Sequence, residues 1–394
     1  MARLGDVFER QITGEWGSEC LENETGTNIL RTTNFTSDGI INYNNVVVRS
    51  IKKSKVESKR LHYGDIILEK SGGTDKTPVG RVVFCDPYIE TGTYLCNNFT
   101  QAMRVNPSMA VPKYVFYFMW NLHWSGKTEL MQNKTTGIRN LQVKSYLNQA
   151  LPIPSLDEQR RIAATLDKVT DLISKRRQQL DKLDELVKAR FVEMFGDPAT
   201  NPKGWDKGTI RDVVTEVKYG TSKPAVEGGT YKYLRMGNIT YDGHLDLTDL
   251  KYIDVPESEL DKCTVKKGDV LFNRTNSKEL VGKTCVYNLD ETMVIAGYII
   301  RVRVNNRVLP EYLSAVLNSS YGKKTLAEMC KAIVGQANIN AQELQNIQIV
   351  IPPLELQYEF LKVIQKIEKI NLPISRSLEK LQTLKKALMQ EYFG

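Results

Sequence analysis

The strongest constraint on the fold of this chain is a series of short motifs that occurs twice, in the same order. Gly-Asp-Ile-Ile-Leu at residues 64–68 returns as Gly-Asp-Val-Leu-Phe at residues 268–272, 204 residues later. Gly-Ile-Arg-Asn-Leu at residues 137–141 matches Gly-Gln-Ala-Asn-Ile at residues 335–339, 198 residues later. An order that persists while the spacing drifts by a few residues indicates duplication of a whole structural plan. The chain is therefore expected to fold as two similar halves.

Each half ends in a stretch that predicts one long helix. These stretches open with Ile-Pro-Ser-Leu-Asp-Glu-Gln at residues 153–159 and with Ile-Pro-Pro-Leu-Glu-Leu-Gln at residues 351–357. Ser155 and Glu158 have the S-x-x-E spacing of a capping box, and Gly196 suits a helix end. A helix that begins after Ser155 and ends before Gly196 has about forty residues. At a rise of 1.5 Å per residue its length is roughly 60 Å. Such a helix is longer than one globular domain requires.

Apolar residues recur along both stretches with the alternating three- and four-residue spacing that is typical of a coiled coil. Those of the first stretch are Ile162, Leu166, Val169, Ile173, Leu180, Leu183, Val187 and Met194, and those of the second are Phe360, Ile364, Ile367, Ile374, Leu378, Leu381, Leu388 and Tyr392. Two seams of matching length can cover each other, and the simplest packing is antiparallel. Pro373 predicts a kink or a local break in the second helix. The alternative is that both helices are core elements of ordinary domains.

The chain is expected to alternate between domains and helices. The predicted parts are a first domain over 1–154, a helix over 155–196, a second domain over 197–352 and a helix over 353–394. The fold class is α+β: two similar mixed α/β domains separated by a pair of long antiparallel coiled-coil helices, with a pseudo-two-fold internal repeat.

Short strands and one helix are predicted inside the first domain. Residues 46–48, 66–68 and 81–84 are rich in β-branched and aromatic side chains, and Pro112 opens a helical pattern. The turn-rich sequence at residues 197–205 marks the boundary to the second domain.

Composition excludes several classes of protein. No apolar run is long enough to span a membrane, and the first residues lack the apolar core of a signal peptide, so a cytoplasmic protein is expected. The six cysteines contain no C-x-x-C pair and the three histidines are scattered, so no metal site or disulfide framework is expected. The net charge of +8 permits a polyanionic partner without requiring one.

The sequence lacks the motifs of catalysis on DNA. No N/D-P-P-Y/F motif of base methylation and no G-x-x-x-x-G-K-S/T phosphate loop are present. The near matches at Asp86-Pro87, Asn106-Pro107 and Asn201-Pro202 lack the second proline and are typical of turns. We therefore expect a protein that is not itself an enzyme and carries no cofactor.

With these residues identified, the chain resembles the specificity (S) subunit of type I restriction-modification systems over essentially its whole length. The resemblance rests on the tandem halves and on five motifs in their order: Leu-Pro-Ile-Pro-Ser-Leu-Asp-Glu-Gln at 151–159, Asn-Pro-Lys-Gly-Trp at 201–205, Leu-Arg-Met-Gly-Asn-Ile at 234–239, Gly-Asp-Val-Leu-Phe-Asn-Arg-Thr at 268–275 and Gly-Gln-Ala-Asn-Ile at 335–339. The second helix departs from the first, having Pro353 and Leu356 in place of the Ser/Glu cap.

The resemblance implies a function and a set of partners. Each domain would be a target-recognition domain that reads one half of a bipartite, asymmetric sequence in double-stranded DNA. The helices would bind two methyltransferase (M) subunits and help to place two restriction (R) subunits, so that the complex directs adenine methylation and restriction in host defence. S-adenosylmethionine would be held by the M subunit, and ATP and Mg²⁺ by the R subunit.

Candidate DNA-binding residues are those in paired polar loops, since Arg suits guanine and Asn or Gln suits adenine in the major groove. In the first domain they are Arg31, Asn34, Lys70, Ser71, Arg139 and Asn140, and in the second they are Arg235, Asn238, Arg274, Asn276, Gln336 and Asn338. Residues common to both domains cannot distinguish two half-sites, so Arg235 and Asn238 have the alternative role of holding a turn or touching phosphates. A different class of function also stays open: a coiled-coil scaffold whose two domains bind proteins.

Overall fold

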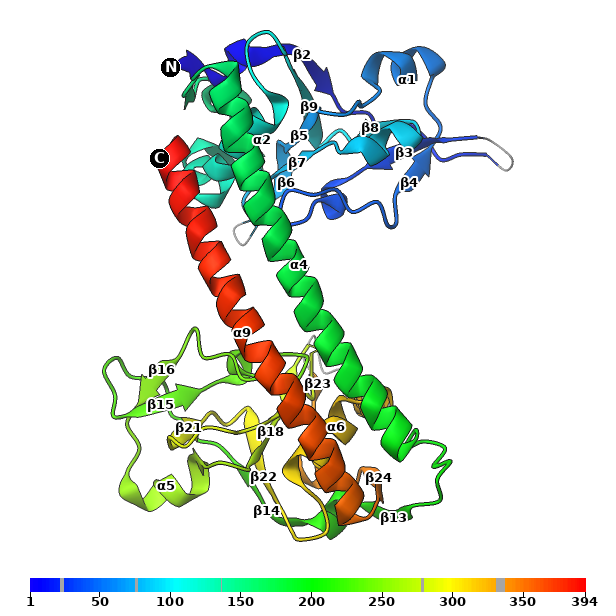
Figure 1. Cartoon of the computed structure of the whole chain (residues 1–394), viewed down its shortest axis with the longest axis vertical. Coiled ribbons are helices and arrows are strands. Elements are labelled where there is room, and N and C mark those ends of the chain that lie inside the picture. Colours follow the sequence, from blue (N-terminus) through cyan, green and yellow to red (C-terminus); the bar gives the residue numbers. More distant parts are fainter. Residues whose placement is uncertain (22–24, 75–76, 136, 278–279, 331–336) are drawn as a thin grey trace. The chain divides into compact units, whose positions relative to one another are not determined.

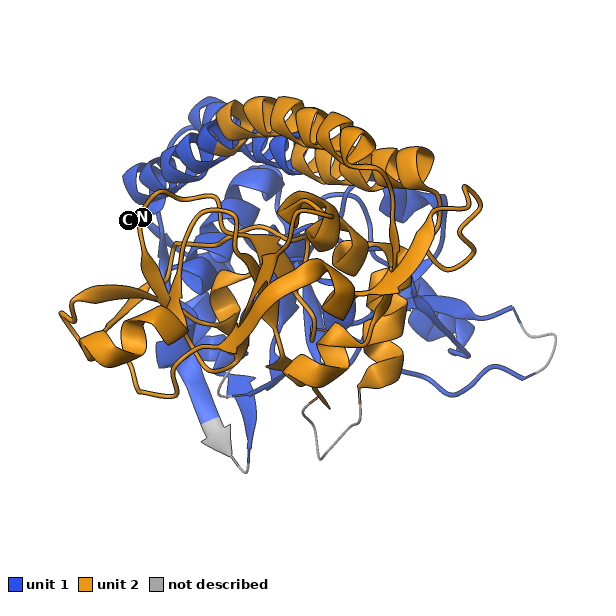
Figure 2. Cartoon of the chain, turned by 90° about the horizontal axis from the view of Figure 1, so that it is seen from below, with its two compact units in different colours: residues 1–177, 376–394 blue, residues 178–375 orange. Residues whose placement is uncertain are grey.

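Two compact units make up the protein. The computed structural model describes residues 1–21, 25–74, 77–135, 137–277, 280–330 and 337–394 (Figure 1). Unit 1 comprises residues 1–177 and 376–394, and unit 2 comprises residues 178–375 (Figure 2). Each unit thus contains one mixed α/β domain together with one part of each long helix.

A four-stranded antiparallel sheet lies at the centre of unit 1. Its strand order is β2 (Phe8–Thr13), β9 (Thr100–Val105), β5 (Ile66–Glu69) and β7 (Val82–Phe84). Alternate residues of a strand face opposite sides of a sheet. Accordingly Ile66 shares a core with helix α2 (Pro112–Trp124), whereas Ile67 belongs to a second core on the other side. All four residues of β5 are buried because both faces of the sheet are covered.

The remaining elements of unit 1 are short. A sheet of β4 (Val47–Arg49), β3 (Thr27–Leu30) and β8 (Tyr94–Cys96) contributes to the second core. The others are β1 (Ala2–Arg3) with β12 (Ala150–Leu151), the sheet of β10 (Gln132–Thr135), β11 (Ile138–Leu141) and β6 (Ser71–Gly73), helices α1 (Lys53–Lys59) and α3 (Val143–Leu147), and 3-10 helices η1 (Leu4–Val7), η2 (Thr32–Asn34), η3 (Pro87–Thr91) and η4 (Lys127–Met131).

Unit 2 repeats this plan. Its central sheet has the order β14 (Val214–Tyr219), β22 (Ile299–Val304), β18 (Val270–Asn273) and β20 (Thr284–Val286), and a second sheet contains β16 (Lys251–Ile253), β15 (Tyr231–Leu234), β21 (Met293–Ile295) and β17 (Thr264–Val265). The others are β13 (Asp206–Thr209) with β24 (Gln348–Ile351), β19 (Thr275–Asn276) with β23 (Ala337–Asn338), helices α5 (Glu257–Cys263), α6 (Pro310–Asn318), α7 (Ser320–Met329) and α8 (Ala341–Gln345), and 3-10 helices η5 (Ile210–Val213) and η6 (Met236–Asn238).

The strands and the helix that were predicted inside the first domain are confirmed. The three strand-like segments correspond to β4, β5 and β7, each within a residue of its predicted bounds, and Pro112 is the first residue of α2. The duplication is confirmed as well, since the two central sheets have the same order and the same antiparallel pairing.

The two predicted long helices are α4 (Leu156–Phe195) and α9 (Leu354–Phe393), with 40 residues each. In unit 1, Ile162 near the start of α4 shares a core with Phe393 near the end of α9. In unit 2, Phe191 and Phe195 near the end of α4 contact Phe360 near the start of α9, with ring centroids 5.9 and 5.3 Å apart. Within each unit the two helix segments therefore pack with opposite chain directions, which confirms the antiparallel pairing.

The start of α4 and the interior of α9 each differ in one detail from the expectation. Ser155 Oγ accepts a hydrogen bond from the Glu158 N–H at 3.3 Å, but the Glu158 carboxylate binds Arg161, so only one half of the capping box forms. The predicted local break at Pro373 is wrong, because α9 continues through this residue. A proline removes a single N–H donor, and the packed turns on both sides can retain the helix.

Candidate functional site

The first group of candidate residues forms the same turn in both units. In unit 1, Asn34 Oδ1 accepts a hydrogen bond from the Arg31 N–H at 2.9 Å and Asn34 Nδ2 donates to the Asn42 carbonyl at 2.9 Å. In unit 2, Asn238 makes the equivalent bonds, to the Arg235 N–H at 2.8 Å and to the Asp246 carbonyl at 2.7 Å. Both asparagine side chains are buried. This geometry favours the structural alternative, in which these asparagines hold a turn.

The second group of candidates in unit 1 meets where β6 pairs with β11. Ser71 lies opposite Asn140 in the register, and the Ser71 hydroxyl donates a hydrogen bond to Asn140 Oδ1. Arg139 is the neighbouring residue on β11, and Lys70 immediately precedes β6. The fold thus brings four predicted residues, about 70 positions apart in the sequence, to one junction. Sequence alone did not indicate this pairing.

The matching junction in unit 2 lies between β19 and β23. Thr275 is opposite Asn338, and the Thr275 hydroxyl donates to Asn338 Oδ1 at 2.9 Å. Arg274 precedes β19, its carbonyl accepts a hydrogen bond from the Ile339 N–H at 2.9 Å, and Asn276 ends the strand. Gln336, the remaining candidate, lies outside the described residues. In both units a hydroxyl therefore orients an asparagine amide beside a basic residue.

An exposed aromatic residue lies beside each junction and was missed by sequence reasoning. The Phe99 side chain is 45% exposed and its carbonyl accepts from the Lys70 N–H at 3.0 Å. Tyr298 is 53% exposed, and its carbonyl accepts from the Arg274 N–H at 2.9 Å. The signal that could have found them is their equal position after a buried strand, 199 residues apart. A cation, a hydroxyl, an amide and an aromatic ring together offer the hydrogen bonds and apolar contacts that base edges require.

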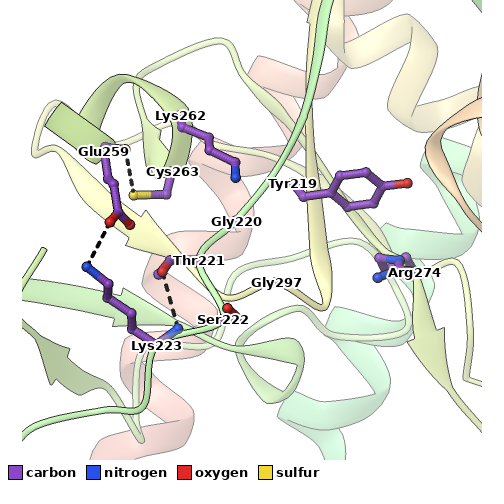
Figure 3. Close-up of a pocket in the computed structure, with 10 residues that line it drawn as sticks. All are labelled: Tyr219, Gly220, Thr221, Ser222, Lys223, Glu259, Lys262, Cys263, Arg274 and Gly297. Atoms are coloured by element: carbon purple, nitrogen blue, oxygen red, sulfur yellow. Dashed lines mark hydrogen bonds and ion pairs between the residues drawn. The ribbon is translucent and has the colours of Figure 1, made fainter.

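A polar cavity of about 600 Å³ adjoins the junction in unit 2 (Figure 3). Arg274 lies on one side of it, with its guanidinium carbon 4.9 Å from the centre of the Tyr219 ring. Lys223 Nζ binds the Glu259 carboxylate at 2.9 Å on the other side. Burial raises the pKa of the Cys263 thiol, which also lines the cavity, and therefore disfavours a reactive thiolate.

A run of basic residues in unit 1 could bind phosphates or form a solvated surface, and several of its members are engaged in contacts within the chain. The run comprises Arg49, Lys52, Lys53, Lys55, Lys59 and Arg60. The Arg49 guanidinium lies 4.4 Å from the centre of the Trp16 ring and binds Glu19 at 3.4 Å. Lys55 and Lys59 both bind Glu15, at 3.0 and 2.9 Å. The geometry therefore does not favour phosphate binding by the whole run.

The described residues show neither a cluster of metal ligands nor a helix that could span a membrane. No three His, Cys, Asp or Glu side chains of that part of the chain gather as metal ligands would. None of its helices is both long enough and apolar enough to cross a membrane.

Comparison with known proteins gives a match to each half of the sequence. A model of the type I restriction modification DNA specificity domain matches residues 1–184 and 202–384. The chain is similar to the specificity subunit of the type I restriction enzyme EcoKI from Escherichia coli strain K12, with 23% identity over 364 residues, which are 86% of this chain and 75% of that protein. It is also similar to the StySPI specificity subunit from Salmonella potsdam, with 21% identity over 359 residues, and the same shares are covered.

The whole chain also has a counterpart among solved structures. The S subunit of the type I restriction-modification system from M. genitalium aligns with a TM-score of 0.54 and 16% identity, and the alignment covers 100% of this chain and 95% of that one. At this level of identity the likeness concerns the fold alone.

Proposed function

The chain belongs to the family of type I restriction-modification specificity subunits, a non-catalytic component of these enzymes, and we propose that each of its two units reads one half of a bipartite, asymmetric sequence in double-stranded DNA. The alternative function as a protein-binding scaffold is less favoured, because a scaffold gives no reason for paired junctions of basic, amide and aromatic side chains. A cytoplasmic location follows from this proposal, since the DNA is found there.

The proposal is supported by the two junctions, which have the same backbone arrangement but carry different side chains. Lys70, Ser71 and Phe99 in unit 1 occupy the places of Arg274, Thr275 and Tyr298 in unit 2, because the two sets make the same backbone hydrogen bonds and strand pairs. A shared frame can present its side chains to the major groove in the same way, while different side chains select different bases.

We assign the reading role to the junction residues. In unit 1 they are Lys70, Ser71, Arg139 and Asn140, and in unit 2 they are Asn276 and Asn338, with Gln336 kept as a prediction, while Arg274 would contact the DNA backbone beside them. Arg31, Asn34, Arg235 and Asn238 support the reading surface from their turns. Phe99 and Tyr298 add apolar contacts, for which the thymine methyl group is the natural partner in the major groove.

The partners proposed for the long helices are two methyltransferase subunits. In unit 1, Leu172 of α4 and Leu384 of α9 are exposed, and in unit 2, Leu186 of α4 and Ile370 of α9 are exposed. Leu172 and Ile370 are 198 residues apart, as are Leu186 and Leu384, so each unit presents an equivalent pair. Exposed apolar residues repeated in this way suit a repeated protein contact.

The chemistry belongs to those partners in this proposal. The methyltransferase subunits would use S-adenosylmethionine to methylate adenine, and restriction subunits would use ATP and Mg²⁺. This chain would supply the choice of sequence to both.

The test is co-expression of this chain with its methyltransferase subunit, followed by sequencing of methylated bases across a genome. We expect one split, asymmetric methylated sequence. Exchange of residues 1–154 for those of another family member should change one half of that sequence and leave the other half intact. Absence of any methylated motif, or a change in both halves, would contradict the proposal. A scaffold would also show no dependence of DNA affinity on salt concentration, whereas phosphate contacts impose a log-linear one.

A further inference from the structure

The loop that follows the first strand of the central sheet carries different charges in the two units. Glu15 in unit 1 and Thr221 in unit 2 occupy the same place: the Glu15 N–H binds the Cys96 carbonyl at 2.8 Å, and the Thr221 N–H binds the Ile295 carbonyl at 2.9 Å. Cys96 and Ile295 end the equivalent strands β8 and β21. The two loops can therefore be compared residue by residue.

In unit 1 this position of the loop is occupied by the carboxylate of Glu15. The Glu15 carboxylate binds Lys59 at 2.9 Å and Lys55 at 3.0 Å, both on α1, and its side chain is only 18% exposed. The hydrogen bond from Lys59, followed by that from Lys55, lowers the pKa of Glu15, so the carboxylate is charged near neutral pH. Two cations and one carboxylate thus close the space between loop and helix.

In unit 2 the same place is open. Thr221 has no charge, and the ion pair between loop and helix is reversed in sign: Lys223 lies on the loop and Glu259 on α5. Lys262 and Arg274 add two further cations to the lining, so three cations face one carboxylate around about 600 Å³. Figure 3 shows Lys262 extending toward the loop that carries Gly220 and Thr221. This positive excess is not neutralised within the cavity.

Arg274 is a basic residue of the cavity lining that lies against an aromatic ring. Its Nε is buried and has no hydrogen-bond partner within the described residues. The guanidinium carbon lies 4.9 Å from the centre of the Tyr219 ring, and a contact of this kind engages the face of a guanidinium rather than the N–H groups with which it binds oxygen ligands. A guanidinium held in this way is suited to a phosphate.

We propose that the cavity of unit 2 binds a backbone phosphate of the DNA, and that Glu15 occupies the corresponding phosphate position in unit 1. This inference rests on the proposed function, since it assumes that unit 2 binds duplex DNA. Lys262 and Arg274 contact the phosphate oxygens, and the cavity also has room for the attached sugar. Unit 2 accordingly makes one phosphate contact that unit 1 lacks.

The experiment measures DNA affinity of the complex with methyltransferase subunits. The probes are duplexes that carry both half-sites and a single neutral methylphosphonate, moved one position at a time. For the natural chain, one methylphosphonate in the half-site of unit 2 should weaken binding about tenfold, as expected for loss of a charge-assisted hydrogen bond. In Lys262→Ala and in Thr221→Glu, the same methylphosphonate should have no further effect. The slope of log affinity against log salt should fall by about 0.9 in both variants.

Two further variants sharpen the test. Lys267→Ala is the matched control, because Lys267 is exposed, binds Asp290 at 3.0 Å and does not line the cavity. It should keep the full sensitivity to the methylphosphonate. Glu15→Thr removes the carboxylate from the equivalent position in unit 1. In this variant a methylphosphonate in the half-site of unit 1 should newly weaken DNA binding. Thermal unfolding shows whether each variant is folded. Because Lys262 is exposed, Lys262→Ala should fold normally and still tests the inference if Thr221→Glu does not fold.

The outcomes separate this inference from the proposed function. If the natural complex binds DNA but the natural chain and Lys262→Ala respond equally to every methylphosphonate, the phosphate site is refuted and sequence reading is not. A different result would be that free adenosine monophosphate binds the natural chain and not Lys262→Ala, while no methylphosphonate weakens DNA binding. In that case the cavity takes a nucleotide and the DNA assignment is overturned. A natural complex that binds no duplex DNA would overturn both.

Discussion

The side chain of Gln159 binds the backbone of Val111, with Gln159 Oε1 accepting a hydrogen bond from the Val111 N–H at 2.9 Å. Val111 immediately precedes α2, so this contact satisfies a donor at the start of that helix. In unit 2, Gln357 makes the same bond to the Leu309 N–H at 2.8 Å, immediately before α6. The glutamine shared by the two helix-entry motifs therefore fastens each domain to its long helix.

Replacement of Gln159 by leucine should destabilise unit 1. The Gln159 side chain is fully buried, and its Nε2 also donates to the Pro154 carbonyl at 3.0 Å, so the variant leaves two partly buried groups, the Val111 N–H and the Pro154 carbonyl, unpaired. We expect a loss of about 2–4 kcal/mol in the free energy of unfolding. Urea titration of the natural and variant chains measures it. Gln178→Leu, at an exposed position of the same helix, is the control, and equal losses in the two variants would contradict the role of Gln159.

The long helices could be predicted because their signals are local. A capping serine at Ser155 and apolar spacing along the helix are visible within a few turns, and the duplication fixes their order. The junction residues could be named but not grouped, since Ser71 meets Asn140 through strand pairing between distant segments. The turn-holding role of Asn34 depends on the loop that folds over it. Phe99 was missed because a lone aromatic residue is more often buried than exposed.

Lys385 interrupts the apolar seam of α9 at a cost to stability. It is buried in unit 1, with its ammonium 4.3 Å from the centre of the Trp120 ring, and burial lowers its pKa to about 8. The folded protein therefore holds fewer protons than the unfolded chain between about pH 8 and the ordinary lysine pKa of about 10.4, and stability rises with pH in that window.

Lys385→Met should consequently stabilise unit 1 at pH 7. The gain from removing a buried charge is partly offset by the lost contact with Trp120, which leaves an expected increase of about 1–2 kcal/mol. Thermal unfolding at pH 7 and at pH 10 provides the measurement, and the gain should shrink toward zero at the higher pH. Lys386→Met, at the exposed neighbouring position, should change little. A gain that is the same at both pH values would be inconsistent with this explanation.

His244 should make the stability of unit 2 depend on pH in the opposite direction. Its Nε2 lies 3.1 Å from Asp184 Oδ1 on α4, and this hydrogen bond is the main cause of a raised pKa, while Asp242 and Glu368 add smaller attractions. The protonated ring therefore stabilises the fold below its ordinary pKa of about 6.5, and this contribution disappears as the pH rises through the raised value.

The corresponding variant is His244→Gln. Because the side chain is half-exposed, we expect a loss of only about 0.5–1 kcal/mol at pH 6 and almost none at pH 9. Melting temperatures at several pH values test this, and Asp184→Asn should abolish the difference between His and Gln at position 244. A difference that is independent of pH would show that charge on the ring is not involved.

The exposed aromatic residues should each affect one half of the DNA sequence. Phe99→Ala should relax discrimination only in the half read by unit 1, and Tyr298→Ala only in the half read by unit 2, by roughly 1 kcal/mol or about fivefold per affected base pair. Binding of the complex with methyltransferase subunits to libraries of altered half-sites resolves the two effects. Tyr252→Ala, an exposed tyrosine on a strand of a different sheet, serves as the control. Loss spread over both half-sites in either variant would argue against the assignment.

The equivalent leucines of the two long helices should determine how many methyltransferase subunits bind. Leu384 is exposed in unit 1 and Leu186 in unit 2, and each is proposed to lie in one copy of a repeated contact. Leu384→Glu or Leu186→Glu places a charge in an apolar interface, where it loses its hydration without gaining a partner. Native mass spectrometry should show one methyltransferase subunit per chain for either variant, none for the double variant and two for the natural chain. Leu130→Glu makes the same change at an exposed leucine outside these helices and should retain two. Two bound subunits in the double variant would place the contact elsewhere on the chain.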